Sequence, residues 1–295
     1  MKKKNRKLEF FPIVGWCLAT FWVVVFLTFL AWMGITSLKS VFDFKFNPLW
    51  LPREEYGGVQ FRNYALAFDA IKIVKQGVTY RAWDMIGNSV FYAFGKALCA
   101  IIPPCLVAYL VAKYNYIPIV AAMWTVVLLY KYVPISASAA SCLAMMKTLG
   151  LYDSMWGIFL WTLSGFGGSF MLLYATWKNV STEYRDAAFI DGAGHFRALI
   201  TVMLPMVVSL LAILFVLNFI GCWNDYVGPM MYLPSYPTLS YGAWTFQFST
   251  ANPEIAITPV QMAGLYTLSL PMLFLFILLR KRIMNMSVGV TGLKG

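Results

Sequence analysis

Long apolar stretches alternate with short polar segments along this 295-residue chain. Four stretches contain no Asp, Glu, Lys or Arg: residues 10–38, 154–177, 198–224 and 255–279. Each exceeds the roughly 20 residues that a helix needs to cross a bilayer. Residues 85–112 and 114–133 are similar, apart from Lys96 in the first and Lys131 in the second. This pattern predicts an all-α polytopic membrane protein with six transmembrane helices.

Composition and charge support this class and indicate an orientation. Hydrophobic residues make up 60% of the chain and charged residues 12%. With the basic start MKKKNRK inside, 13 of the 23 Lys and Arg lie on the cytoplasmic side and 8 outside, so both termini are predicted to be cytoplasmic. The net charge of +11 is then explained by orientation and contact with anionic lipid, and it does not call for nucleic acid.

The apolar pattern divides the chain into four regions. Residues 1–9 form a basic cytoplasmic start, 10–38 the first transmembrane helix, 39–84 an extracytoplasmic loop, and 85–295 a core with the other five helices. The first apolar run is too long for a cleaved signal peptide and lacks a small-residue cleavage site.

The segment 181–205, STEYRDAAFIDGAGHFRALITVMLP, is a polar loop between two apolar runs. Glu183 and Asp186 suit the first turn of a short helix, where acidic side chains offset the positive end of the helix dipole. Ala187 and Ala188 favour helix and keep its surface low, and Gly192 can adopt the positive φ that ends it. The segment therefore predicts a short, shallow helix and a sharp turn, suited to a groove on a soluble partner.

This segment resembles the cytoplasmic coupling loop of ABC-importer permeases. The family frame of E-A-A, D-G-A, an aliphatic pair and proline is met by Asp186, Ala187, Ala188, Asp191, Gly192, Ala193, Ile200, Leu204 and Pro205. Asp186 departs from it, because the family usually has the longer Glu there. Other segments resemble the carbohydrate (maltose-type, binding-protein-dependent) branch in the same order, at 61–68, 88–90, 108–113, 147–160, 223–233 and 261–271.

The resemblance implies a permease subunit for a sugar or oligosaccharide in a bacterial cytoplasmic membrane. Its partners would be a second homologous permease, an ATPase dimer that binds ATP-Mg, and an extracytoplasmic solute-binding protein. The chain has no G-x-x-x-x-G-K-[ST] phosphate loop, so it is expected to bind no cofactor and catalyse no reaction. The coupling helix would lie between helices four and five, with Glu183, Asp186, Ala187, Ala188, Asp191, Gly192 and Ala193 at the ATPase.

Four residues of the predicted spans are candidates for the substrate path: Lys96, Lys131, Asn218 and Asn224. An ionisable side chain inside a membrane is costly and marks function by default. No acidic residue lies within the six spans, so neither lysine is expected to have an acidic partner there. Lys131 could extend to the interface, whereas Lys96 is deeper and would suit an acidic sugar such as a uronic-acid oligosaccharide.

Three further features carry smaller predictions. Pro103-Pro104 should kink the second helix, because proline removes a helical hydrogen bond. Pro234, Tyr236 and Trp244, between helices five and six, are candidates for contact with the binding protein, or belong to an interfacial aromatic belt. The lone His195 and the five cysteines lack metal-ligand spacing, so no metal site is expected.

Three alternatives remain open: an ABC permease for another solute, an ion-coupled secondary carrier, and an assembly subunit. Carriers usually contain an internal repeat with broken helices, and the sequence shows none.

Overall fold

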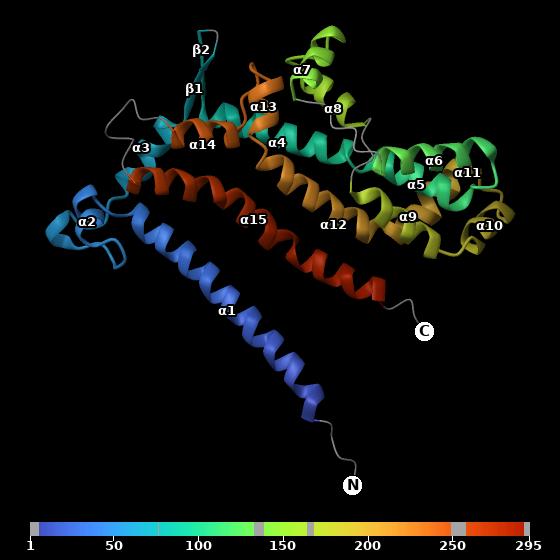
Figure 1. Ribbon diagram of the computed structural model, residues 1–295, viewed down its shortest axis with the longest axis horizontal. Helices are drawn as coiled ribbons and strands as arrows, with labels where there is room; N and C mark the ends of the chain where they lie inside the picture. The colour runs from blue at the N-terminus through green and yellow to red at the C-terminus, as the bar shows by residue number, and fades with distance from the viewer. Residues whose placement is uncertain (1–5, 76, 133–138, 164–167, 249–257, 292–295) are drawn as a thin grey trace. The chain divides into compact units, whose positions relative to one another are not determined.

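The computed structural model describes residues 6–75, 77–132, 139–163, 168–248 and 258–291 (Figure 1). These fall into two compact units. The first comprises residues 1–72 with 243–271, and the second residues 73–242 with 272–295. Each unit is described by itself below.

The first unit holds most of the N-terminal part of the chain. Its elements are α1 (Arg6–Ser37), α2 (Val41–Phe46), the short 3-10 turn η1 (Glu54–Tyr56) and α3 (Arg62–Ala70). Three elements cross the boundary between the units: β1 (Lys72–Lys75), α14 (Leu239–Gln247) and α15 (Thr258–Thr291). Inside the first unit, Gly34 of α1 faces Tyr266 of α15, whose ring would lie 3.5 Å from a Cβ at position 34.

A buried polar cluster shapes the segment that follows α1. The Asn63 amide donates to the backbone carbonyls of Ser37 and Lys39, both at 2.8 Å. The Lys39 ammonium, itself buried, donates to the carbonyl of Asn47. Because buried polar groups need partners, these bonds fix the chain in one course. Residues 37–63 are thus held together by buried polar contacts.

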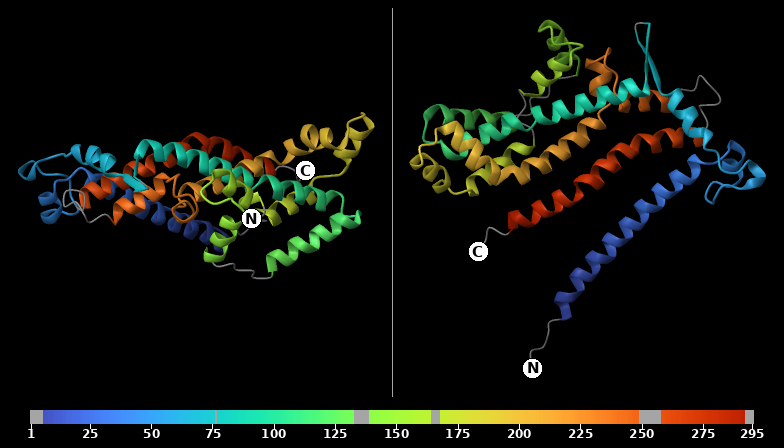
Figure 2. Two further views of the ribbon diagram at one scale, coloured as in Figure 1. Left: turned by 90° about the horizontal axis from the view of Figure 1, so that it is seen from above. Right: turned by 180° about the vertical axis from the view of Figure 1, so that it is seen from behind.

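The second unit is a layered bundle. Its elements are β2 (Val78–Arg81), α4 (Ala82–Cys99), α5 (Ile102–Lys113), α6 (Pro118–Tyr132), α7 (Ala139–Thr148), α8 (Met155–Leu163), α9 (Ser169–Asn179), α10 (Glu183–Ile190), α11 (His195–Ala198), the π-helical turn η2 (Leu199–Met203), α12 (Leu204–Trp223) and α13 (Val227–Tyr232). In the views of Figures 1 and 2, α4 runs beside α12, and these two helices pack together, as do α5 and α9.

The main apolar core of this unit lies between α5, α9 and α12. Phe170, Leu173 and Trp177 of α9 are fully buried there, against Tyr109 of α5 and Met203 of η2. The Trp177 and Tyr109 rings meet edge-on with centroids 5.0 Å apart. Large aromatic side chains therefore join α5 and α9.

The chain is mainly helical, as the apolar pattern predicts. Among the described residues, three helical segments are long and apolar enough to cross a membrane: Pro12–Ser37, Ala82–Lys113 and His195–Trp223. A shorter apolar helix covers Pro118–Leu129. The predicted run 154–177 is divided between α8 and α9, and residues 164–167 lie outside the described residues. A two-stranded sheet, β1 with β2, departs from the all-α prediction.

The predicted kink in the second helix is an interruption of the helix. α4 ends at Cys99 and α5 begins at Ile102, with Pro103 and Pro104 in its first turn. Proline is tolerated in a first turn because its missing N–H would have no helical partner there. The two prolines thus set the start of a new helix.

Gly157 of α8 marks a close approach that a small change should disrupt. A Cβ there would lie 2.1 Å from the carbonyl oxygen of Leu151, a backbone atom that cannot rotate away. We expect Gly157→Ala to lower the thermal midpoint of the purified protein, at a cost of about 1–3 kcal/mol typical of overpacking. Gly87→Ala in α4, where a Cβ meets nothing within 4 Å, is the control and should be neutral or slightly stabilising. Equal midpoints for the two variants would contradict the contact.

Candidate functional site

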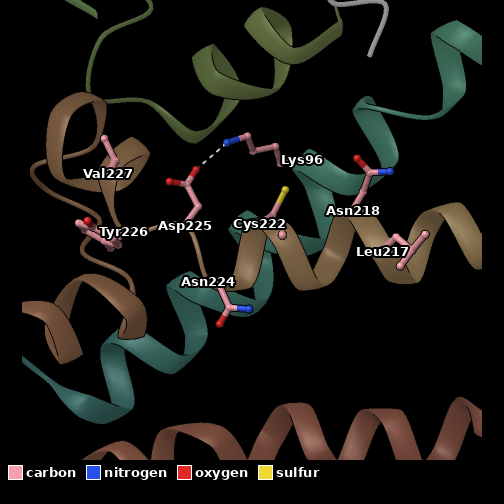
Figure 3. A pocket seen from close by; sticks show the side chains of 9 residues that line it. Lys96, Leu217, Asn218, Cys222, Asn224, Asp225, Tyr226 and Val227 are labelled. Carbon is pink, nitrogen blue, oxygen red and sulfur yellow. Dashed lines mark hydrogen bonds and ion pairs between the residues drawn. The ribbon is translucent and has the colours of Figure 1, made fainter. Parts of the chain in front are cut away.

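A groove of about 540 Å³ lies at the C-terminal end of α12 (Figure 3). It is lined by Lys96, Leu217, Asn218, Gly221, Cys222, Asn224, Asp225, Tyr226 and Val227. Three of the four predicted path residues, Lys96, Asn218 and Asn224, therefore share one groove. The side chain of the fourth, Lys131, lies outside the described residues.

The charged centre of the groove is an ion pair. Lys96 Nζ lies 2.8 Å from Asp225 Oδ2, and the two side chains are 26% and 23% exposed. The Tyr92 hydroxyl donates to the same carboxylate oxygen at 2.7 Å and accepts from Lys96 Nζ at 2.7 Å. Tyr92 and Lys96 share a face of α4 because they are four residues apart. Lys96 thus has an acidic partner that the sequence analysis did not identify, because Asp225 follows the predicted span 198–224 by one residue.

Asp225 is held in place from the other side by the turn into α13. Its Oδ1 accepts the Gly228 N–H at 2.9 Å, and its own carbonyl accepts from the Ser240 hydroxyl at 2.9 Å. A Cβ at position 228 would lie 2.6 Å from the Tyr92 hydroxyl oxygen and 2.7 Å from Asp225 Oδ2. Glycine at 228 therefore permits the close approach of Tyr92 and Asp225.

Asn218 and Asn224 add uncharged hydrogen-bonding groups to the groove. Each amide donates one N–H to a carbonyl of its own helix, Leu214 at 2.8 Å and Ile220 at 3.1 Å. Within the part of the chain that the structure describes, the remaining polar groups of both amides bond to no other residue. The groove thus offers donors and acceptors in addition to the ion pair.

The segment 181–205 forms the predicted short helix. α10 spans Glu183–Ile190, with Glu183 and Asp186 in its first turn. Gly192 has φ +81°, as its predicted role requires. The Gly192 N–H donates to the Phe189 carbonyl at 3.0 Å and the Ala193 N–H to the Ala188 carbonyl at 2.9 Å, the two bonds of a Schellman motif.

The exposed face of α10 carries the acidic residues. Glu183, Asp186, Ala187 and Asp191 are exposed, whereas Ala188 is buried within the chain. Of the two alanines, Ala187 alone is thus available on the surface, and Ala188 packs against the rest of the unit.

Arg185 ties α10 to the end of α5, a connection that sequence reasoning missed. Its guanidinium donates to the Lys113 carbonyl at 3.2 Å and to Asp186 Oδ1 at 2.9 and 2.7 Å, and lies 5.0 Å from the centre of the Tyr114 ring. Burial opposes its charge, yet the Asp186 carboxylate outweighs this and raises the pKa of Arg185. In addition, the Lys113 ammonium donates to the Val180 carbonyl.

We expect Arg185→Lys to loosen α10, because a lysine cannot reproduce the forked set of hydrogen bonds. Hydrogen bonds to charged groups are worth about 1.5–3 kcal/mol. Hydrogen–deuterium exchange of residues 183–190 should therefore speed up by about tenfold or more. Arg197→Lys, at an exposed position on α11, is the matched control and should leave exchange there unchanged. Equal exchange in both variants would show that Arg185 does not hold the helix.

His195 has a structural contact in the same region. Its Nδ1 lies 3.0 Å from the Tyr114 hydroxyl, and its ring meets Phe189 edge-on at 4.7 Å. It therefore helps to seat α11 beside α10 and the start of the α5–α6 connection.

The residues predicted to contact a binding protein fall in both units. Pro234 and Tyr236 follow α13 in the second unit, and Trp244 belongs to the part of α14 in the first. Tyr236 is 40% exposed and lines a second cavity of about 250 Å³, together with Asn88, Phe91, Ser154, Met155 and Trp156.

Residues 76–284, more than half of the chain, match the family described as "Binding-protein-dependent transport system inner membrane component". The chain belongs to this family. It is a membrane permease component of a binding-protein-dependent transport system, and the ion-coupled carrier considered from the sequence is excluded by this membership.

Curated relatives of the permease include two named for sugar uptake. The diacetylchitobiose uptake system permease protein NgcG of Streptomyces coelicolor is 26% identical over 222 residues, 75% of this chain and 68% of the relative. The maltodextrin transport system permease protein MalD of Streptococcus pneumoniae is 27% identical over 233 residues, 78% of this chain and 80% of the relative.

A solved structure shares the fold of the permease. A chain of a bacterial ABC transporter involved in the import of the acidic polysaccharide alginate superposes with a TM-score of 0.74, covering 95% of this chain and 99% of the other. The sequences are 20% identical, so the likeness concerns the fold.

Proposed function

We propose that the permease forms one half of the membrane pore of an ATP-driven importer for a sugar or oligosaccharide. On this proposal six helices cross a bacterial cytoplasmic membrane and both termini are cytoplasmic. Relatives named for diacetylchitobiose and maltodextrin transport align with three-quarters or more of the chain and support a sugar as the solute.

The observation that carries the proposal is the polar groove beside α12. Lys96, Asn218, Asn224 and Asp225 meet where two long apolar helices pack together. Polar groups at membrane depth are costly against lipid, so such a groove must face water or another protein. A pore shared with a second, homologous permease meets this need. Sugar hydroxyls, which both donate and accept, match the mixed groups of the groove.

The segment 181–205, the coupling segment, supplies the link to ATP. We assign Glu183, Asp186 and Ala187 of α10, and Asp191 directly after it, to polar and close contacts with one subunit of a partner ATPase dimer, which binds ATP-Mg. Ala188 packs within the chain, while Gly192 and Ala193 close the turn that sets the angle of α10. Closure of the ATPase dimer would pull two such helices together and switch the pore from inward-facing to outward-facing. The permease itself binds no nucleotide and no other cofactor on this proposal.

Solute would reach the pore from an extracytoplasmic binding protein. Pro234 and Tyr236 after α13, and Trp244 of α14, are the candidates for contact with it. The exposed ring of Tyr236 suits such a surface, because aromatic residues are enriched at protein interfaces.

The proposal is tested by isolating the permease from its native membrane in mild detergent and reconstituting what accompanies it. We expect a second permease and an ATPase in the complex, and ATP-dependent uptake of maltotriose or diacetylchitobiose once the binding protein is added. A complex that hydrolyses ATP but moves neither sugar would redirect the proposal to a non-sugar solute. Isolation of the chain alone, from a preparation that retains other membrane complexes, would contradict the assembly.

A further inference from the structure

The groove contains opposite charges in direct contact. Lys96 is the lining cation and Asp225 the lining anion, and their 2.8 Å separation cancels most of the field that either would exert alone. The remaining residues that line it carry no formal charge. A solute that enters this groove therefore meets a wall of zero net charge.

Asp225 is also more firmly fixed than Lys96. Its carboxylate accepts from Lys96, from the Tyr92 hydroxyl and from the Gly228 N–H, so both of its oxygens are occupied. Lys96 Nζ donates to Tyr92 and to Asp225, which leaves one of its three N–H groups for a solute. A carboxylate on the solute would have to approach Lys96 beside an aspartate that cannot turn away.

We propose that the groove is a solute subsite selective for uncharged oligosaccharides, and that Asp225 is the residue that excludes acidic ones. The proposal rests on the sugar-import function above. The free N–H of Lys96 and the amides of Asn218 and Asn224 bind hydroxyl groups, while Asp225 repels a uronate and holds the charge of Lys96 neutralised.

Cys222 gives a direct readout, because it lines the groove between Asn218 and Asn224 (Figure 3). In a permease whose other four cysteines are replaced by alanine, Cys222 is the one thiol of this chain left for N-ethylmaleimide, and labelling is measured on this chain. The assembled transporter in nanodiscs, without the binding protein, is labelled in the presence of maltotriose, of diacetylchitobiose, or of either sugar after oxidation of its C6 hydroxyls to carboxylates. The half-protecting concentration of each sugar is then compared, so that a change in thiol reactivity between variants does not matter.

We expect at least one neutral sugar to protect Cys222, with its oxidised form requiring at least about tenfold higher concentration. Asp225→Asn keeps the size of the side chain but frees the charge of Lys96. It should narrow the gap between the half-protecting concentrations of the neutral and the oxidised sugar to less than about threefold. Lys96→Met should widen the gap, because it leaves Asp225 unbalanced. Asp153→Asn is the matched control: its carboxylate bonds Ser235 outside the groove, and the gap should stay as in the parent chain.

Equal or stronger protection by the oxidised sugar, or an unchanged gap in Asp225→Asn, would overturn the charge selectivity. Absence of protection by any of these sugars would overturn the groove as a solute site. Both results are compatible with ATP-driven sugar uptake by the reconstituted complex, so they are distinguishable from a failure of the proposed function, in which neither sugar is taken up.

Discussion

Replacing Gly192 with valine should reduce ATP-driven sugar uptake by about fivefold or more while the protein still inserts and assembles. Gly192 has φ +81°, and a β-branched residue is strained there by about 1–3 kcal/mol. The strain is relieved by breaking the two hydrogen bonds that end α10, from the Gly192 and Ala193 N–H groups. Since each 1.4 kcal/mol is a factor of ten, the equilibrium constant for forming the turn that orients α10 would fall by about fivefold to a hundredfold. Uptake into proteoliposomes and co-purification of the ATPase measure the two effects.

Gly194→Val is the matched control in the same loop. Gly194 has an ordinary φ of −72°, and a Cβ there meets nothing within 4 Å, so its uptake should stay close to that of the parent chain. Full uptake by the Gly192→Val variant would refute the role of the turn. A loss of equal size in both variants would show that the loop tolerates no added bulk, whatever its backbone angle.

Removing one member of the ion pair should destabilise the protein more than removing both. Lys96→Met leaves Asp225 partly buried with no cation, and breaking a buried pair costs about 3–5 kcal/mol. Because each side chain is about a quarter exposed, solvent screens part of this, and we expect about 2–3 kcal/mol. Lys96→Met combined with Asp225→Asn should recover part of the loss. Thermal unfolding of the purified complex, with size-exclusion chromatography as the readout, measures the difference in stability between the single and the double variant.

The same cycle with Asp153 provides the comparison. Asp153 accepts from the Ser235 N–H at 2.9 Å and from its hydroxyl at 2.6 Å, and it shares no hydrogen bond with Lys96 or Asp225. Lys96→Met and Asp153→Asn should therefore be additive within about 0.5 kcal/mol. Additivity for the Lys96 and Asp225 changes as well would mean that the ion pair contributes no coupling energy.

Features set by neighbouring residues were predictable from the sequence. The helix of α10, the acidic residues in its first turn and the positive φ of Gly192 follow from local preferences that act within a few residues. The interruption before Pro103 follows from the chemistry of proline. The long apolar helices follow from the apolar composition of their segments. In lipid the backbone N–H and C=O groups must bond to one another, and a helix achieves this within a single segment.

Features that depend on residues far apart in the sequence were not predictable from it. Lys96 and Asp225 are 129 residues apart, and no periodicity connects α4 with the end of α12. The predicted span ends at residue 224, so Asp225, the acidic partner, falls one residue outside it. Arg185 and Lys113 are 72 residues apart and presented the same difficulty. A sequence signal was nevertheless present for the ion pair, since Tyr92 and Lys96 are spaced to share one helix face.

The helix that leaves the coupling segment is also the wall of the groove. From His195 to Trp223 the helical course continues through η2 without interruption for 29 residues, about 44 Å at 1.5 Å per residue. One end is seated beside α10, and the other carries Asn218 and Cys222. On the proposed function, a displacement of α10 would therefore reach the groove through one continuous helix, and its irregular π-helical turn η2 lies at the end next to α10.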